Sequence, residues 1–206
     1  MKKRQQKKKL QPQNKQNSSN TLRIIAGQWR GRKLSFATAP GLRPTPDRVR
    51  EMLFNWLQGH LVDARGLDLF AGSGALGFEA LSRGMAHVTL VENNRAATAN
   101  LQENIQLLKT NQAELIPIDA FQYLENLPRA EKPHQAFDLI FLDPPYRKNL
   151  LPKLVDSIRG KKLLAPNGLL YLEHEKEEVL EISLKDFELI KEKTTGQVVS
   201  KLLRRL

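Results

Sequence analysis

The sequence predicts an α/β protein built on a doubly wound, mostly parallel sheet of seven strands. From Arg65 onward, short apolar runs alternate with segments of helical periodicity, which is typical of such sheets. The first of these runs stops in a glycine loop, residues 72–77, that continues as a helix. The last two predicted strands are joined by a turn so short that they must pair antiparallel, which predicts an antiparallel strand at the C-terminal end.

The N-terminal segment is expected to be a basic, disordered tail over residues 1–20. It consists mostly of Lys, Gln, Asn and Ser, and Met1 and Leu10 are its sizeable apolar residues. Such a segment cannot bury enough surface to offset its ordering entropy. We expect residues 21–206 to form a single domain, in which residues 21–60 are an extension made of a β-hairpin and a helix.

The hairpin is predicted from two short apolar stretches, residues 22–27 and 32–36, around a turn that contains Gly31. Cations and an aromatic side chain gather here: Arg23, Trp29, Arg30, Arg32 and Lys33. An exposed Trp29 among these cations would suit base stacking beside phosphate contacts. The alternative is that Trp29 covers a small core of the hairpin.

A loop over residues 40–44 precedes the predicted helix of the extension. Thr45 is expected to cap this helix, with Pro46 at its first position. The apolar residues recur at helical spacing and should dock on the main domain: Val49, Met52, Leu53, Trp56 and Leu57. Arg48, Arg50 and Glu51 are expected to face elsewhere.

The main domain is predicted to alternate strand and helix. The strands are expected at residues 66–70, 87–91, 114–118, 137–142, 168–173, 187–191 and 197–202, and the helices at residues 75–83, 94–108, 120–127 and 149–160. The charged run from Glu173 to Glu178 is interpreted as a solvated helix face, on which His174 lies at the surface.

The charge is distributed unevenly along the chain. The net charge is +11, and residues 1–50 hold 14 Lys and Arg against one acidic residue, which leaves residues 51–206 slightly acidic. A basic N-terminal attachment is a candidate contact for a polyanion, because each neutralised phosphate releases counterions. The alternative is a solvated, solubilising tail.

Composition excludes several classes of site. The chain has no cysteine, and its four histidines lie far apart in sequence, so we expect no disulfide and no metal site. No apolar run approaches the roughly 20 residues that a membrane span needs. A cytoplasmic protein without a membrane partner is therefore expected.

The glycine loop predicts a seat for a cofactor. Gly72, Gly74 and Gly77 have G-x-G-x-x-G spacing, in which the first takes positive φ, the second admits a ligand to bare backbone and the third lets helix pack on strand. Glu92 lies 20 residues past Gly72 at the end of the next strand, where a carboxylate could accept from both hydroxyls of a ribose.

Other acidic residues stand at strand ends, where open α/β sheets bind their ligands. They are Asp68, Asp119 and Asp143, which join Glu92 and the glycine loop. Asp119 precedes Ala120 and an aromatic residue, a setting that fits the amino group and ring face of an adenine. Its alternative role is to cap the following helix.

The fourth predicted strand of the main domain ends in Asp143-Pro144-Pro145-Tyr146. Two successive prolines remove two backbone donors, so the loop offers acceptors and one aromatic face. This set fits a flat substrate that bears an amino group. Asp143 and the Pro144 carbonyl would accept its two hydrogens while Tyr146 stacks on the ring, which turns the nitrogen lone pair toward an electrophile.

These motifs resemble those of the Rossmann-like S-adenosylmethionine-dependent amino-methyltransferases. The stretches 23–32, 42–51, 67–77 and 143–146 together resemble the ribosomal RNA small-subunit methyltransferase D family over about residues 21–206. The resemblance implies methyl transfer from S-adenosylmethionine to the 2-amino group of a guanine in 16S ribosomal RNA, without a metal. Residues 1–20 fall outside the family pattern.

The resemblance also implies roles for individual residues. Asp68, Gly72 and Gly74 would hold the methionine part of the cofactor, Glu92 the ribose and Asp119 the adenine, while the loop of residues 143–146 would be catalytic. The full cofactor set that we expect is Thr45, Arg48, Asp68, Phe70, Gly72, Ser73, Gly74, Glu92, Asp119 and Ala120. The expected partner is 16S ribosomal RNA, free or within a small ribosomal subunit, and we expect a monomer.

The residues alone leave four other functions open. A nicotinamide-dependent dehydrogenase would share the glycine loop and Glu92 but would leave residues 143–146 without a purpose. A DNA amino-methyltransferase shares the acceptor loop, and a protein glutamine methyltransferase typically has Asn at the place of Asp143. A non-catalytic RNA-binding module with the same fold is the fourth.

Overall fold

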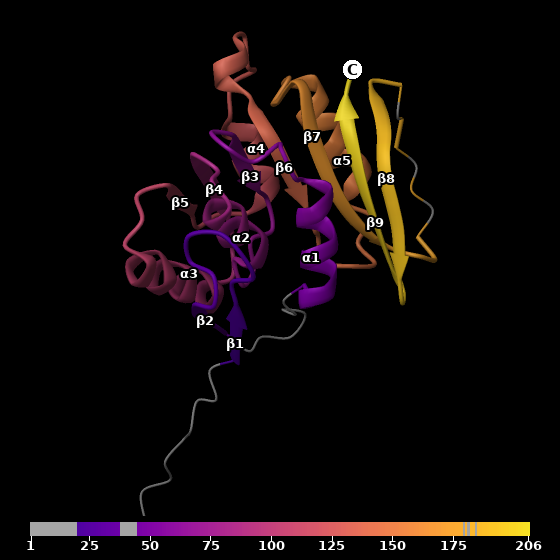
Figure 1. The fold of residues 1–206 in the computed structure, drawn as a ribbon. Helices are drawn as coiled ribbons and strands as arrows, with labels where there is room; N and C mark the ends of the chain where they lie inside the picture. Colours follow the sequence, from indigo (N-terminus) through magenta and orange to yellow (C-terminus); the bar gives the residue numbers. More distant parts are fainter. Residues whose placement is uncertain (1–19, 38–44, 179, 181, 184) are drawn as a thin grey trace, which may run out of the picture.

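The computed structural model describes residues 20–37 and 45–206, except residues 179, 181 and 184. The predicted tail therefore lies outside the described residues up to residue 19, and so does the predicted loop of residues 40–44. Described are a small hairpin, a seven-stranded sheet and the helices that cover it (Figure 1).

The extension begins with the predicted hairpin. Strands β1 (Asn20–Arg23) and β2 (Lys33–Phe36) pair antiparallel in a two-stranded sheet of their own. Helix α1 (Asp47–Trp56) follows, as expected. The prediction that Thr45 caps this helix is wrong, because Pro46 occupies the cap position and no side chain caps the helix. Thr45 is instead buried against a cavity that is described below.

The main sheet has the order β5-β4-β3-β6-β7-β9-β8. Its strands are β3 (Arg65–Asp68), β4 (His87–Val91), β5 (Ala113–Ile116), β6 (Phe137–Leu142), β7 (Leu164–Glu175), β8 (Phe187–Thr195) and β9 (Val198–Arg205). Strand β9 runs antiparallel to both of its neighbours, β7 and β8, and the other pairs are parallel. The predicted fold class is therefore confirmed.

The helices form a layer on each face of the sheet. They are α2 (Ala75–Ser82), α3 (Arg95–Leu108), α4 (Ala120–Asn126) and α5 (Leu151–Gly160), and a short 3₁₀ turn, Pro133–Gln135, precedes β6. Apolar residues of α1, α2 and α3 pack on one face of the sheet, and those of α4 and α5 pack on the other (Figure 1). In β6, Leu139 and Phe141 face the first layer while Ile140 and Leu142 face the second, as the two-residue period of a strand requires.

The charged run after the fifth predicted strand does not form the expected helix face. Strand β7 extends to Glu175, and Glu173 and His174 are buried within it. The local pattern misled because β7 lies between β6 and β9, so its polar side chains are enclosed by neighbours that come from distant parts of the chain. A run of charges indicates solvation only where no such neighbours cover it.

Candidate functional site

A cavity of about 870 Å³ opens at the carboxyl ends of the parallel strands. The chain leaves central strand β3 toward β4 and β5 on one side and later returns to β6 on the other, so the strand order reverses here. Open α/β sheets bind ligands at this reversal. The walls come from the loops after β3, β4, β5 and β6, from the end of β7, from the β8–β9 turn and from the start of α1.

The glycine loop after β3 has the positive φ expected at its first glycine. At two of its positions, a side chain would also collide with neighbouring residues. Gly72 and Gly74 have φ values of 51° and 76°, in the left-handed region that favours glycine. A Cβ on Gly77 would lie 2.3 Å from the Leu90 side chain, so the prediction that this glycine lets α2 pack on β4 is confirmed. A Cβ on Gly74 would lie 2.4 Å from the ring of Phe78, so this glycine is also required by packing.

Glu92 lies at the end of β4 and lines the cavity. Its two carboxylate oxygens accept hydrogen bonds from the backbone N–H of Gly72, at 2.8 Å, and of Asn94, at 2.7 Å. Glu92 therefore ties the glycine loop to the start of α3. Each carboxylate oxygen has a second lone pair, so the predicted contact with ribose hydroxyls remains chemically available.

Asp119 both caps a helix and lines the cavity. Its Oδ1 accepts from the backbone N–H of Phe121, at 2.8 Å, and of Gln122, at 3.3 Å, so the capping alternative is confirmed. Ala120 and Phe121 line the cavity beside it. The adenine contact stays a prediction, and the capping bonds use one carboxylate oxygen of the two.

The acceptor loop follows β6 directly, and all four of its residues line the cavity. Asp143 is half-buried, Pro144 is buried, and the Tyr146 side chain is exposed. Burial raises the pKa of Asp143 well above its usual value, and the neighbouring carboxyl groups of Glu173 and Asp68 raise it further. The loop thus places one carboxyl group and one aromatic ring at the cavity, and the role of the Pro144 carbonyl stays a prediction.

Asp68 is buried and does not appear among the described residues that line the cavity. Its side chain is buried within the core, where the backbone N–H groups of Phe70 and Gly77 donate to it. Burial is the main reason that its pKa rises from 3.8 to about 7, against these two hydrogen bonds. The described residues that line the cavity include Phe70 but not Asp68, Gly72, Ser73 or Gly74. The expected contacts of these four residues with the cofactor stay predictions.

The extension contributes one wall of the cavity through Thr45, Pro46 and Val49. Arg48 was also expected at the cofactor, but its side chain is exposed on α1 and it is not among the described residues that line the cavity. The helical period explains the difference, because Val49 takes the inward position and its neighbour points outward.

The lining residues that were not anticipated as site residues include Glu173, Lys148 and Thr195. Lys148 follows the acceptor loop, and Thr195 ends β8. Glu173 carries a signal that could have found it, because it directly follows the apolar run of β7 just as Asp143 follows that of β6. Burial raises the pKa of Glu173, and a hydrogen bond from Tyr171 partly opposes this.

The candidate RNA-binding side chains lie on the hairpin. Arg23, Arg30, Arg32 and Lys33 are exposed. Trp29 is partly buried and packs against the core, which favours the alternative that it covers apolar surface. Base stacking by Trp29 and phosphate binding by the four cations stay predictions.

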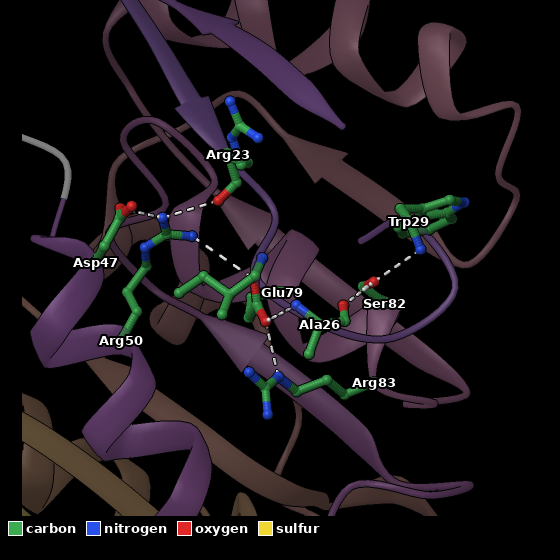
Figure 2. Close-up of polar contacts among 9 residues, drawn as sticks. Arg23, Ala26, Trp29, Asp47, Arg50, Glu79, Ser82 and Arg83 are labelled. Atoms are coloured by element: carbon green, nitrogen blue, oxygen red, sulfur yellow. Dashed lines mark hydrogen bonds and ion pairs between the residues drawn. The ribbon is translucent and has the colours of Figure 1, made fainter. Parts of the chain in front are cut away.

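A buried ion-pair cluster joins the extension to the main domain (Figure 2). Glu79 of α2 is fully buried and accepts from the backbone N–H of Ile25, at 2.8 Å, and of Ala26, at 3.0 Å. Arg83 pairs with the same carboxylate at 2.7 Å, and Arg50 of α1 approaches it to 3.6 Å. The expectation that Arg50 faces away from the main domain is therefore wrong.

Arg50 also bonds within the extension itself. Its Nη2 donates to the carbonyl oxygen of Arg23, at 2.9 Å, and to Asp47, at 2.6 Å (Figure 2). Ser82 adds a second link, because its hydroxyl accepts from the Trp29 backbone N–H at 3.0 Å and donates to the Ala26 carbonyl at 2.6 Å. One side of this cluster holds the loop between β1 and β2, and the other holds the helix that walls the cavity.

Neither a membrane-spanning helix nor a cluster of metal ligands occurs in the described part of the chain. No helix in the described part of the chain is both long and apolar enough to cross a membrane. Within residues 20–37 and the described part of 45–206, no three His, Asp or Glu side chains gather where they could hold a metal ion. The expected cytoplasmic location and the expected metal-free reaction stay predictions.

The fold is that of the Rossmann-like methyltransferases. A solved structure of an Escherichia coli protein has a TM-score of 0.79 and 43% identity, over 90% of this chain and 98% of that chain. A more distant solved structure that contains SAH has a TM-score of 0.63 and 16% identity, over 83% of this chain and 53% of that chain, and shares the fold alone.

Sequence relatives narrow the class to a family. The family described as conserved hypothetical protein 95 matches residues 22–204. Ribosomal RNA small subunit methyltransferase D of Escherichia coli (strain K12) is 46% identical over 189 residues, 91% of this chain and of that protein. Its namesake from Haemophilus influenzae is 45% identical over 188 residues, 90% of this chain and 95% of that protein. The chain belongs to the ribosomal RNA small subunit methyltransferase D family, which confirms the resemblance of the motifs.

Proposed function

We propose that this protein transfers a methyl group from S-adenosylmethionine to the 2-amino group of a guanine in 16S ribosomal RNA. The observation that carries the proposal is the acceptor loop, residues 143–146, at the same cavity as Glu92 and Asp119. The names of the relatives support small-subunit ribosomal RNA as the substrate. The choice of guanine rests on the resemblance of the motifs.

The cavity suits the cofactor chemically. Glu92 offers acceptors for ribose hydroxyls, and Asp119 with Phe121 and Ile118 offers an acceptor beside apolar surface for an adenine. When bound, S-adenosylmethionine supplies a methyl group that its sulfonium charge already activates. Asp68 and the glycine loop would hold the methionine end of the cofactor, as the resemblance of the motifs implies.

The protein's own task at the acceptor loop is to position the base. Asp143 and the Pro144 carbonyl accept the two hydrogens of the amino group, and Tyr146 stacks on the ring. This arrangement turns the nitrogen lone pair out of conjugation and toward the methyl group. As the new N–C bond forms and the C–S bond breaks, the nitrogen becomes acidic, and Asp143 can take the proton that it sheds.

The hairpin and the tail would bind the RNA at a distance from the acceptor loop, where methyl transfer takes place. We propose that Arg23, Arg30, Arg32 and Lys33 contact phosphates and that Trp29 stacks on a base, while residues 1–20 add a weaker electrostatic contact. Residues 21–206 would act as a single, monomeric domain in the cytoplasm. The target base would be reached in a loop or by extrusion from a helix.

The decisive experiment is methyl transfer from labelled cofactor to small-subunit RNA that lacks the modification, followed by mapping of the labelled nucleotide. Asp143→Ala should lower transfer by about a hundredfold or more while cofactor affinity stays near that of the native protein. Tyr146→Ala should act in the same direction. Label on an atom other than guanine N2, or native rates in either variant, would contradict the proposal.

A further inference from the structure

A second carboxyl group stands beside Asp143 in the cavity. Strands β6 and β7 pair in parallel, with residues 141–142 of one opposite residues 171–172 of the other. The next residue along the chain is acidic in both cases, Asp143 just past the end of β6 and Glu173 within β7, and both line the cavity. Neighbouring strands lie about 4.8 Å apart and alternate residues share a face, so the two side chains project side by side.

The Glu173 side chain is held by its own strand. The Tyr171 hydroxyl donates to Oε1 of Glu173 and lies 3.1 Å from the Ser200 hydroxyl oxygen. Among the described residues, Tyr171 is the one that hydrogen-bonds to the Glu173 carboxylate. Tyr171 and Glu173 are both buried, so the orientation of the carboxylate is constrained and its Oε2 is left for a ligand.

A pair of acceptors side by side matches one edge of guanine. On that edge the 2-amino group and the ring N1–H stand next to each other, and both donate. Adenine and 2,6-diaminopurine have a bare lone pair at N1. A carboxylate facing N1 would attract guanine and repel these bases.

We propose that Glu173 is the specificity-determining residue of the acceptor site, accepting a hydrogen bond from the N1–H of guanine while Asp143 accepts from its 2-amino group. This inference rests on the proposed function and extends it to the choice of base. Burial raises the pKa of both carboxyl groups, and repulsion from Glu173 raises that of Asp143 further, so two donors presented together would stabilise the pair in its charged form. A base with an acceptor at N1 would leave that repulsion in place.

The substitution Glu173→Gln makes a directional test. The Gln side-chain oxygen can still accept from Tyr171, which would turn the amide NH₂ toward the cavity. A donor would then face N1, which disfavours guanine and suits 2,6-diaminopurine. The substrates are two versions of the small-subunit RNA fragment that carries the mapped nucleotide, with guanine or 2,6-diaminopurine at that position.

We expect the native enzyme to prefer guanine in kcat/KM by at least about tenfold, since one hydrogen bond to a charged group is lost with the analogue. Glu173→Gln should lower kcat/KM on guanine RNA by about 10- to 100-fold and reduce or reverse the preference. Its cofactor affinity should stay near the native value. An unchanged preference in a folded Glu173→Gln protein would overturn the inference.

Two further variants separate recognition from a general charge effect. Glu175→Gln makes the same charge change on the same strand, at a residue that is not among the described residues lining the cavity, and should keep the native preference. Adding Tyr171→Phe to Glu173→Gln frees the amide to rotate and should weaken the reversal. An equal shift in Glu175→Gln would overturn the inference.

If Glu173→Gln fails to fold, the native enzyme still tests the role of Glu173 through its preference between the two RNAs. Equal transfer to guanine and 2,6-diaminopurine by the native protein would overturn the role of Glu173 while leaving guanine methylation intact. Absence of transfer to guanine N2 in any small-subunit RNA would instead overturn the proposed function.

Discussion

Replacing Glu79 tests how the extension is attached to the main domain. Glu79→Ala removes the acceptor of the Ile25 and Ala26 backbone N–H groups and the partner of Arg83 and Arg50. Removing one partner of a buried ion pair costs about 3–5 kcal/mol. The two backbone donors are only partly buried and can recover water, so we expect a total loss of about 4 kcal/mol.

Urea unfolding followed by tryptophan fluorescence measures this loss, because Trp29 and Trp56 are the two tryptophans of the chain and both lie in the extension. The matched control is Glu188→Gln, which breaks an exposed ion pair with Arg204 and should cost less than about 1 kcal/mol. If Glu79→Ala cost no more than this control, the cluster would not anchor the extension.

Hydrogen exchange locates the effect within the molecule. The amides of Ile25 and Ala26 donate to Glu79, so their protection should fall more in Glu79→Gln than that of amides in β3. The same variant should also raise the KM for RNA and lower cofactor affinity, because α1 walls the cavity. Uniform loss of protection across β3 and the extension would show that Glu79 supports the whole fold instead.

Three further predictions concern the cofactor, pH and RNA. Glu92→Ala should weaken S-adenosylmethionine binding by about 10- to 100-fold in calorimetry, since it removes a charged acceptor, and unchanged affinity would remove Glu92 from the site. Because burial raises the pKa of Asp68 from 3.8 to about 7, its neutral form stabilises the fold fully below pH 3.8, and this stabilisation is lost as the pH rises through 7. In urea unfolding, the stability of the native protein relative to Asp68→Asn should then fall by up to about 1.4 kcal/mol per pH unit across that window, and a flat difference would contradict the burial argument. Replacing Arg30, Arg32 and Lys33 by Ala should reduce the log-log salt slope of RNA binding by roughly 0.7–0.9 per lost phosphate contact, and an unchanged slope would place the RNA elsewhere.

Helix α1 connects the extension to the cavity. The start of α1 supplies one wall, and the Arg50–Glu79 cluster holds this helix against α2, which begins at the glycine loop. A single buried cluster thus links the hairpin, the cavity wall and the helix that follows the glycine loop. Substitutions there should affect RNA binding and cofactor binding together, whereas substitutions at Asp143 should not.

The features that could be predicted from the sequence depend on local chemistry. Strand and helix positions follow from apolar periodicity, and the Gly77 packing contact follows from the spacing of the glycine loop. Glu92, Asp119 and Asp143 were found because polar residues that end apolar strands gather at one edge of a parallel sheet. The antiparallel C-terminal pair follows from a turn too short for any other connection.

Other features depended on long-range contacts that periodicity does not encode. The burial of Glu173 required β9 to lie beside β7, and the burial of Arg50 required α1 to lie beside Glu79. Asp68 ends an apolar strand as Asp143 does, yet β3 lies between β4 and β6, so the Asp68 side chain is buried in the core, where the N–H groups of Phe70 and Gly77 donate to it. A charged side chain is buried only where distant segments supply its partners, so only the tertiary structure could decide these cases.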